Sequence, residues 1–529
     1  MRPYDWLSEL LARFEDEHIY VHPRTHQTLR SAYIVLLDPE DWGKAAAQTA
    51  RFGLRWAAGW ADQLDADTFT VQACLVREGD YLLLRTQVER RKPVLPSHTP
   101  YYPNADRPER HIQDLWGLAF LDHPDARRWT RHQAWEEDQY PLRQDFPLAG
   151  TPSEFTPPDN GYPFLQAKGS AVYEIPVGPV HAGIIEPGHF RFQAVGETVL
   201  NLEEHLGYVH KGIEKLAVGR DGPGLIRLAA RVSGDATVSH AWAACQAMEQ
   251  AVGLTIPPRG AWLRGLLLER ERVANHLGDI GAIGNDVGFA FSWYQFSRLR
   301  EQWTRTNYQA FGHRLLMDTL VPGGVARDLE ETQQTALEAQ IPLLRQEIQQ
   351  LIPLLLENPS LEDRLETTGI LSPTLASRLG CLGYVGRASG QNQDVRRDRP
   401  SPPYHRYSLA VPCLDGGDVD ARVQIRLQEI LASLDLMEQL LKELPAGPVV
   451  VPWQQPEEGA EGLGMVEGWR GETLAYLRFG PAGRVIRYFP RDPSWLNWPA
   501  LERLVRDNIV PDFPVCNKSV NGSYSGHDL

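Results

Sequence analysis

Cysteine is scarce in this sequence and widely spaced. The 529 residues include five cysteines, and no two of them form a CxxC pair: Cys74, Cys245, Cys381, Cys413 and Cys516. Structural zinc sites and iron–sulfur clusters need several thiolates close together, and small secreted domains need dense disulfides. The sequence therefore argues against a cysteine-held metal or cluster in this chain and favours a reducing compartment.

Several other signals are missing. No charge-free apolar run of about 18 residues occurs, and the acidic, amphipathic N-terminus does not resemble a signal peptide. The motifs GxGxxG (strand–helix context), P-loop, HExxH and GxSxG are absent, which leaves nucleotide binding and hydrolase chemistry unsupported. Lys and Arg number 53 against 68 Asp and Glu, a net charge of −15 that argues against a nucleic-acid partner. A cytoplasmic chain of more than one domain is expected.

The patterning predicts an α+β chain of two units. Residues 1–148 mix strand-like runs (31–37 and 81–88) with helical ones (41–61 and 109–120), which predicts a small α/β domain. Residues 149–169 are rich in Pro, Gly, Ser and Asn and read as a linker. Residues 170–529 predict a large, mainly helical bundle with small β elements.

Within the second unit, strand-like runs at 171–178 and 188–202 precede long amphipathic stretches. Helices are expected over 263–277, 291–316, 328–357 and 423–441, with Pro342 and Pro353 kinking or interrupting the third. Residues 472–488 alternate as a hairpin around the turn Gly-Pro-Ala-Gly at 480–483.

Three stretches concentrate glycine and polar groups. They are GPVH with EPGHF (178–181 and 186–190), RVSGD through His240 (231–240), and the polar tail 516–529. Carboxylates and imidazoles can pass protons, and Ser and Asp cap helices well. An ordinary turn, a helix cap and a solvated terminus are the more frequent explanations of the three, and Cys516 is expected to be a small buried apolar side chain. The residues alone indicate a proton-handling cleft at most.

The end of the first unit contains a specific sequence motif. Residues 109–128 read ERHIQDLWGLAFLDHPDARR, followed by YPLRQDFP at 140–147. This resembles the signature of the 30-kDa subunit of respiratory complex I, with Asp122 in place of the family's glycine.

The remainder resembles the 49-kDa subunit of complex I and the large subunits of membrane-bound [NiFe] hydrogenases, closest to the hydrogenase-3 and hydrogenase-4 (formate hydrogenlyase) branch, where both domains are fused in this order. The matching words include GPVH, EPGHFRF, GYVHKGIEKLA (207–217), LLLERERVANHLGDIGAIGNDVGF (266–289), GRASGQNQDVRRDRP (386–400) and GDVDAR (417–422). The resemblance spans roughly 360 residues.

In the hydrogenases, two cysteine pairs hold nickel and iron. Here the resemblance places the first pair at Ser233 and Ala236 and the second at Ser523 and Gly526. Hydroxyl, methyl and glycine cannot replace soft thiolates, so no metal ligand is expected and the nickel–iron centre is expected to be absent. The related hydrogenases lose a C-terminal peptide after nickel loading, and no such cleavage is expected here.

Two neighbours of the lost metal are kept. Glu186 matches the hydrogenase glutamate that moves protons, and Arg470 matches the arginine that overhangs the metal, with Trp469 replacing proline. Asp235 and His240 are the other candidate catalytic residues, and His181 and Tyr524 the candidate ligand-binding ones.

A cleft with carboxylate and guanidinium but no metal resembles the quinone chamber of complex I. The resemblance is incomplete, since the quinone-contacting histidine and tyrosine of complex I fall near Ile185 and at Gly234.

The resemblance implies a peripheral-arm oxidoreductase subunit of the NADH:quinone oxidoreductase type, on the inner face of the cell membrane. Its acceptor, quinone or another compound, would receive electrons from a [4Fe–4S] cluster of an iron–sulfur partner subunit, coupled to ion translocation by antiporter-like membrane subunits. The alternatives are a non-catalytic scaffold subunit of such a complex and a true [NiFe] hydrogenase, which the missing cysteines disfavour. The electron donor, the use of NADH and the ion pumped stay open.

Overall fold

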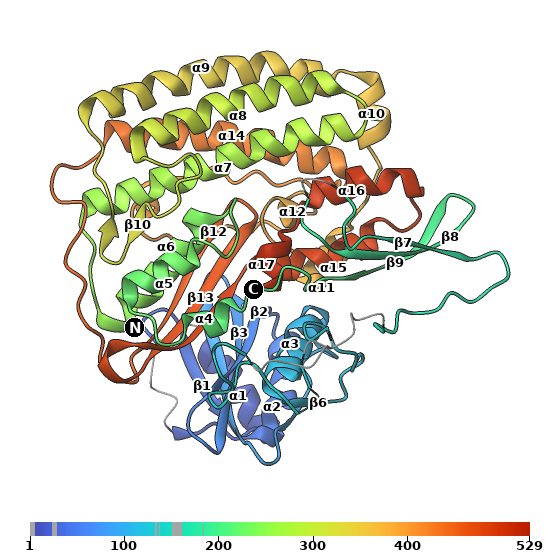
Figure 1. The fold of residues 1–529 in the computed structure, drawn as a ribbon, viewed down its shortest axis with the longest axis vertical. Coiled ribbons are helices and arrows are strands. Elements are labelled where there is room, and N and C mark those ends of the chain that lie inside the picture. The colour runs from blue at the N-terminus through green and yellow to red at the C-terminus, as the bar shows by residue number, and fades with distance from the viewer. Residues whose placement is uncertain (1–5, 24–28, 133–134, 137, 151–160, 183–184) are drawn as a thin grey trace.

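The computed structural model describes residues 6–23, 29–132, 135–136, 138–150, 161–182 and 185–529. Figure 1 shows an N-terminal unit at the bottom, a layer of long helices at the top, and a three-stranded sheet between them. The predicted mixture of strands and helices, with a helical bundle in the second part, is confirmed.

The N-terminal unit is built on a four-stranded sheet with the order β1-β4-β3-β2. Strands β1 and β4 are parallel and the other pairs are antiparallel. The elements of this unit are α1 (Leu7–Asp16), β1 (Tyr33–Leu37), α2 (Trp42–Arg51), β2 (Arg55–Gln63), β3 (Thr68–Arg77), β4 (Asp80–Glu89), β5 (Val94–Pro96), α3 (Asp106–Trp116) and β6 (Ala119–Leu121).

The helix predicted over residues 41–61 is wrong in its second half. Helix α2 ends at Arg51, and Gly53 takes a backbone φ of 85°, which reverses the chain into strand β2. The alanines of β2 favour a helix locally, but packing overrides this preference: the Trp60 ring lies 4.9 Å from Tyr476 and 5.1 Å from Phe489.

The second unit contains two three-stranded antiparallel sheets. One joins β7 (Tyr173–Val177), β8 (His189–Val195) and β9 (Thr198–His205), and the other joins β12 (Glu461–Gly468), β13 (Gly471–Phe479) and β14 (Val485–Arg491). The predicted hairpin over 472–488 is confirmed as β13–β14, with its turn at Pro481–Gly483. A two-stranded ladder pairs β10 (Leu320–Val321) with β11 (Gly324–Val325).

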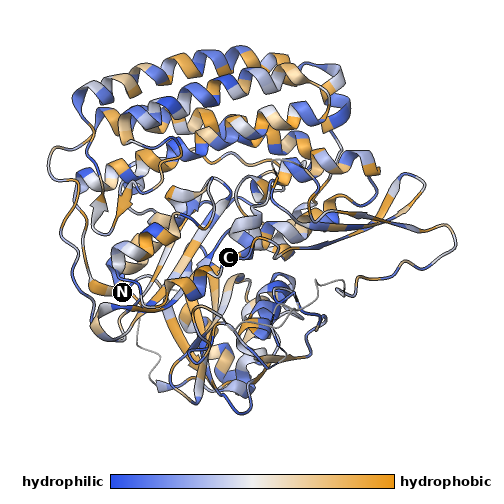
Figure 2. Ribbon diagram, viewed as in Figure 1, coloured by the Kyte–Doolittle hydropathy of each residue, from blue (hydrophilic) through white to orange (hydrophobic). Residues whose placement is uncertain are grey.

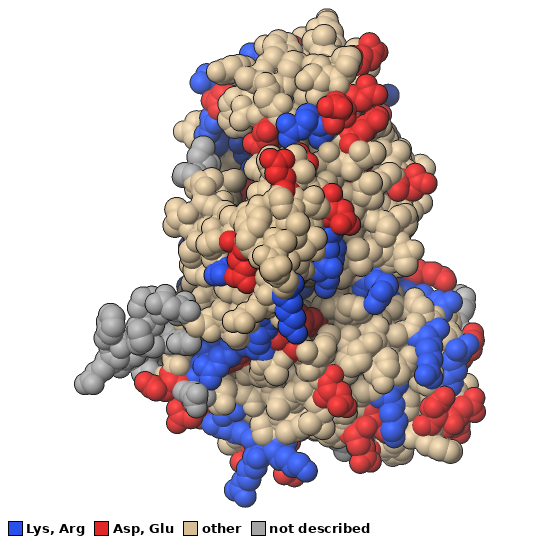
Figure 3. All heavy atoms as spheres, turned by 90° about the vertical axis from the view of Figure 1, so that its right-hand side faces the viewer, with Lys and Arg blue, Asp and Glu red and all other residues tan. Residues whose placement is uncertain are grey.

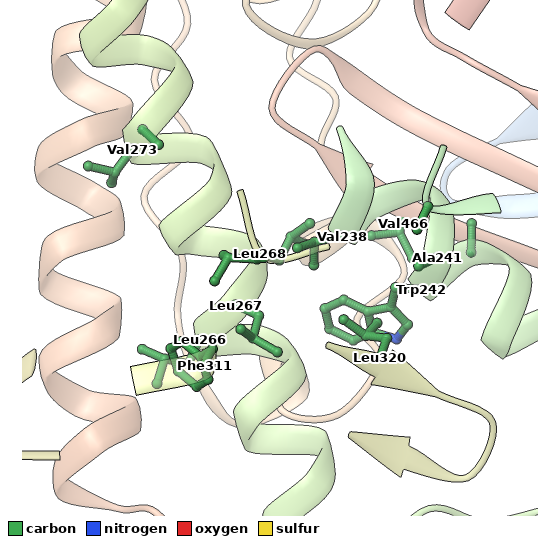
Figure 4. Packing of buried hydrophobic residues seen from close by; sticks show 14 of the residues in the cluster. Val238, Ala241, Trp242, Leu266, Leu267, Leu268, Val273, Phe311, Leu320 and Val466 are labelled. Atoms are coloured by element: carbon green, nitrogen blue, oxygen red, sulfur yellow. The ribbon is translucent and has the colours of Figure 1, made fainter. Parts of the chain in front are cut away.

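Long helices form the top layer (Figure 1). They are α7 (Pro258–Asp286), α8 (Ala290–Phe311), α9 (Glu331–Leu356) and α14 (Val419–Lys442). Helix α6 (Thr237–Val252) lies below this layer, beside strand β12 (Figure 1). Helix α9 runs through Pro342 and Pro353 without ending, because its buried face, including Leu337, Ile341 and Ile348, holds it on the bundle. Val238 and Trp242 of α6 pack toward Leu266 and Leu267 of α7 (Figure 4).

Short helices complete the second unit and carry the chain to its C-terminus. They are α4 (Ile213–Ala217), α5 (Gly222–Ala229), α10 (Pro359–Leu365), α11 (Pro373–Leu379), α12 (Gly383–Arg387), α13 (Val395–Asp398), α15 (Ser494–Leu504), α16 (Phe513–Val520) and α17 (Tyr524–Asp528).

The two units share a core. One buried cluster combines Trp60 and Leu83 of the first unit with Leu463, Tyr476 and Phe489 of the second. Charged pairs border it, with Arg478 bonded to Asp62 at 2.7 Å and Arg85 to Glu461 at 2.8 Å. The N-terminal sheet therefore packs directly on the β12–β14 sheet. The predicted linker lies partly outside the described residues, and the boundary at 148 stays a prediction.

The surface is polar and mixed in charge. Hydrophilic and hydrophobic residues alternate along the long helices (Figure 2), as expected for helices that bury one face. On the face drawn in Figure 3, side chains of both charge signs are interspersed and are densest over the lower half. Among the described residues, no helix has the length and apolar character needed to cross a membrane.

Candidate functional site

The C-terminal tail packs against the loop that precedes helix α6. The Ser233 and Ser523 hydroxyl oxygens are 2.8 Å apart and hydrogen-bonded, and Ser233 also donates to Asp235 Oδ1 at 2.7 Å. Ser523 caps helix α17 by accepting the Gly526 N–H at 2.9 Å. Ala236 lies in the same buried cluster as Tyr524. The two segments that the resemblance assigns to metal binding thus lie side by side, 290 residues apart in the chain.

A carboxylate fills the space beside Gly526. A Cβ atom added at this glycine would lie 2.5 Å from Asp492 Cγ, too close for any side chain unless Asp492 moved. Asp492 is held in place because its Oδ1 accepts the Ser494 N–H at 2.8 Å and its Oδ2 lies 2.8 Å from His240 Nε2. A thiol at position 526 would therefore not fit this arrangement.

Arg470 and Asp235 form a two-pronged ion pair. Arg470 lies in the tight turn between β12 and β13, and its Nη1 and Nη2 donate to Asp235 Oδ1 and Oδ2 at 2.8 and 2.7 Å. The Arg470 Nε donates to the Asn521 carbonyl of the tail at 2.7 Å. Burial opposes the charge on Asp235, but Arg470 and the Ser233 hydroxyl outweigh it and lower the pKa of that carboxyl. The pair thus stays charged at neutral pH.

His240 and Asp492 form a second, fully buried pair. Each side chain is 1% exposed. Burial would raise the pKa of Asp492, yet the bond to His240 and the nearby Arg470 charge hold it well below the usual value for a carboxyl. His240 Nδ1 is buried without a hydrogen-bond partner among the described residues. The imidazole is therefore held from one side, through Nε2 and Asp492.

Glu186, His181 and Tyr524 meet on the outer side of the tail. The exposed Glu186 carboxylate accepts the Ser525 N–H at 2.9 Å and the Ser525 hydroxyl as well. Tyr524 Oη lies 3.2 Å from His181 Nε2. Burial, and then the charge of Lys518, lower the pKa of His181, so this imidazole is neutral at physiological pH. Each of the six predicted site residues therefore lies in the tail or in the loop before α6, or contacts one of these two segments directly.

Sequence reasoning missed Asp492 and two groups that fix Asp235. Asp492 precedes Pro493 and Ser494 and looks like an ordinary start of helix α15, so no local pattern predicts its contact with His240. The Asp235 carbonyl accepts bonds from the Trp469 indole at 2.9 Å and the Asn275 amide at 2.7 Å. Asn275 lies in the motif at 266–289 that resembles the hydrogenases, and this was the only signal in the sequence that pointed to it.

The residues do not fit a nickel–iron centre. Two hydroxyls, a methyl group and a glycine stand where four thiolates would be needed, and the two hydroxyls bond to each other. Within the described part of the chain, no group of three or more His, Cys, Asp or Glu side chains is arranged to hold a metal ion. Cys516 is buried, as predicted, and its thiol packs near Gly369 rather than at this site.

Comparison with protein families gives three matches along the chain. Residues 35–152 match the respiratory-chain NADH dehydrogenase 30-kDa subunit, residues 211–278 match nickel-dependent hydrogenases, and residues 286–461 match the respiratory-chain NADH dehydrogenase 49-kDa subunit.

Individual relatives agree with these matches. The chain is 32% identical to formate hydrogenlyase subunit 5 of Escherichia coli K12, over 85% of this chain and 79% of the relative. It is 32% identical to hydrogenase-4 component G of the same organism, over 85% and 78%. A solved chain from a membrane-bound sulfane sulfur reductase, an archaeal respiratory membrane complex, superposes with a TM-score of 0.64 at 27% identity, over 68% of this chain and 99% of that one.

Proposed function

Because the chain belongs to the family of fused complex I 30-kDa/49-kDa-type subunits that includes formate hydrogenlyase subunit 5 and hydrogenase-4 component G, we propose that it is the subunit of a complex I-like respiratory complex that carries the acceptor site. The site works without nickel and reduces an acceptor other than protons. Quinone is the first acceptor to test, since complex I uses this fold for it.

One observation carries the proposal: the four positions that bear metal ligands in the hydrogenases converge here without a thiol. Ser233 and Ser523 bond to each other, and Asp492 blocks position 526. Arg470, in the β12–β13 turn, and Glu186, between β7 and β8, are nevertheless retained beside that space. A site that has lost its metal donors while keeping its charged and proton-carrying groups is suited to an organic or inorganic acceptor.

The residues divide into two roles. The Arg470–Asp235 pair fixes a charge at the site and can bind or orient an acceptor. His240 with Asp492 on the inner side, and Glu186 on the outer side, can supply protons. Reduction of a quinone to a quinol consumes two electrons, which an iron–sulfur partner subunit provides, and two protons, which these groups provide.

The membrane-bound complexes of the relatives support a proposal for partners and location. The complex is expected to contain an iron–sulfur small subunit and antiporter-like membrane subunits, and this chain to lie at the membrane surface through them. Ion translocation would be coupled to proton uptake at the site.

Acceptor reduction by the purified complex tests the proposal. Glu186→Gln keeps the size and one of the two hydrogen-bond acceptors but cannot carry a proton. Quinone reduction should therefore fall at least about tenfold, or about 1.4 kcal/mol of activation free energy. Glu338→Gln, an exposed carboxylate of helix α9, is the matched control and should leave the rate unchanged. Equal rates in all three proteins, with unchanged proton coupling, would contradict the proposal.

A second candidate function is that of a non-catalytic scaffold. It is supported by the observation that polar groups of the site are hydrogen-bonded to one another. The Ser233 and Ser523 hydroxyls and the Arg470 and Asp235 charges all pair within the chain. A scaffold would need nothing further from these groups. It requires that complexes carrying Glu186 or Arg470 substitutions assemble normally and lose no activity.

A further inference from the structure

A cavity of about 440 Å³ opens beside the Arg470–Asp235 pair. It lies between helices α7 and α8 and the end of α16, and it is large enough for a small molecule. Asp235, whose side chain is 35% exposed, forms one wall, so the cavity leads to the proposed acceptor site. Its polar lining also includes Asn275, Asp279, Arg300, Glu301, Arg314, Lys518 and Asn521.

Each of the three carboxylates in the lining is already paired with arginine. Asp235 is held by Arg470, as described above. Asp279 lies 3.2 Å from an Arg426 nitrogen and also accepts a bond from the Asn521 amide at 2.8 Å. Glu301 bonds to both Arg305 and Arg314. These carboxylates therefore leave no uncompensated negative charge facing the cavity.

Two cations in the lining have no such partner. Among the described residues, no carboxylate oxygen lies within 4 Å of the Arg300 guanidinium or the Lys518 ammonium, and Arg300 Nε is buried without a hydrogen-bond partner. Arg300 can lie across helix α7 because Gly278 has no side chain: a Cβ there would lie 3.2 Å from Arg300 Cδ and Nε. The charge of Lys518 partly offsets the rise that burial causes in the pKa of Asp286, but the two charged groups are farther apart than an ion pair.

Unpaired cations in a half-enclosed pocket attract anions strongly, because the surrounding protein screens charge less than water does. A guanidinium adds directed N–H donors that match oxyanions. We infer that this cavity binds a small polyatomic anion, held by Arg300 and Lys518 next to the Arg470–Asp235 pair. This inference rests on the proposed function for its meaning, since the anion would be the acceptor or would sit in the acceptor's place.

Sulfate titrated into the purified complex tests the inference. The titration is followed by calorimetry, with chloride used to keep ionic strength constant so that general screening does not change. One saturable site per chain is expected. Binding should weaken at least about tenfold in Arg300→Gln and in Lys518→Gln, and Arg300→Lys should restore part of it.

Arg298→Gln is the matched control, because Arg298 lies on the same helix α8 but pairs with Glu347 at 2.7 Å. It should bind sulfate like the unmodified complex. No saturable binding, or equal affinity in all variants, would overturn the inference.

The same preparations separate this inference from the proposed function. If sulfate binds as expected while Glu186→Gln and Arg470→Lys leave acceptor reduction unchanged, the cavity stands and the proposed function fails. If a neutral quinone is reduced in a Glu186-dependent way while sulfate does not bind, the proposed function stands and the anion site fails.

Discussion

Two buried groups of charges lie in the second unit, and they differ in how they are built. The deep cluster, made of Glu269, Arg272, Arg387, Asp394, Arg396, Glu429 and Glu467, has side chains no more than 6% exposed. The site cluster, made of Ser233, Asp235, His240, Arg470, Asp492 and Ser523, includes Asp235 at 35% exposure beside a cavity. Asp394 and Glu467 of the deep cluster line a separate cavity, yet no side chain of that cluster is more than 6% exposed. The site cluster is the more solvated of the two, at Asp235.

The elements that carry the two clusters explain the difference. Most of the deep cluster comes from the bodies of helices and strand β12, where Arg387 bonds to Glu429 at 2.6 Å and to Glu467 at 2.8 Å. The site cluster comes mostly from the loop before α6, the β12–β13 turn, the β14–α15 connection and the tail; only His240 lies within a helix, in α6. Arg272 of the deep cluster donates to the carbonyls of Glu467 and Gly468, at 2.7 and 3.2 Å, just before Arg470. The deep cluster therefore supports the turn that presents the site.

Breaking the deep cluster should have the largest effect on stability. Glu429→Gln leaves Arg387, Arg272 and His276 facing a neutral amide in a sealed interior. Loss of one partner from a buried ion pair costs about 3–5 kcal/mol of unfolding free energy. Chemical denaturation, or the yield of assembled complex, measures this. A loss below about 1 kcal/mol would show that the two clusters do not differ as described.

Glu429 also predicts how the free energy of unfolding depends on pH in the acid range. Burial would raise the pKa of Glu429, but Arg387 and His276 outweigh it and hold the pKa well below the usual value. The stability from this carboxylate is present above its unfolded pKa of about 4.3 and is lost as pH falls below that value, at up to about 1.4 kcal/mol per pH unit. As pH is lowered, the unfolding free energy of Glu429→Gln should fall less steeply than that of the unmodified protein. Equal slopes would contradict the assignment.

At the site cluster the main effect should fall on turnover. Arg470→Lys keeps the charge but loses the two-pronged bond to Asp235. Acceptor reduction should fall at least about tenfold, whereas unfolding free energy should fall by only about 1–2 kcal/mol because Asp235 is partly solvated. Steady-state rates and denaturation are measured on the same preparations. If Arg470→Lys lost as much unfolding free energy as Glu429→Gln, both clusters would have a structural role.

The smallest effect is expected from Ser233→Ala. It removes bonds to Ser523 and Asp235 but leaves the Arg470–Asp235 pair in place. A loss of about 1 kcal/mol is expected for a neutral hydrogen bond, with little change in turnover. Thermal denaturation of the complex detects it, and Ser433→Ala, which removes a hydroxyl bonded to Glu269 at 2.6 Å, gives the matched loss in the deep cluster.

Local features of the fold were predictable from sequence, and features set by packing were not. The turn at 480–483 and the amphipathic face of α9 are encoded within a few residues, so the hairpin and the helix were predicted correctly. The strand that contains Trp60 was missed because its alanines favour a helix and because the rings that pack on Trp60, those of Tyr476 and Phe489, lie more than 400 residues away in the chain.

The site shows the same limit. Resemblance to the hydrogenases identified the loop and the tail, but nothing in the sequence indicated that Asp492 occupies the space beside Gly526 or that Ser233 bonds to Ser523. Both contacts join segments that only the folded chain brings together. The cavity beside Asp235 is likewise formed by α7, α8 and the tail, and no single stretch encodes it.

The nickel content of the native complex tests the central claim most directly. The claim is that the site at Ser233, Ala236, Ser523 and Gly526 functions without a thiolate-bound metal. Elemental analysis of the purified complex, produced in cells that mature other nickel hydrogenases, should find nickel far below one atom per chain, with iron accounted for by the partner's clusters. One nickel per chain, lost on substitution of Ser233 or Ser523, would contradict the account.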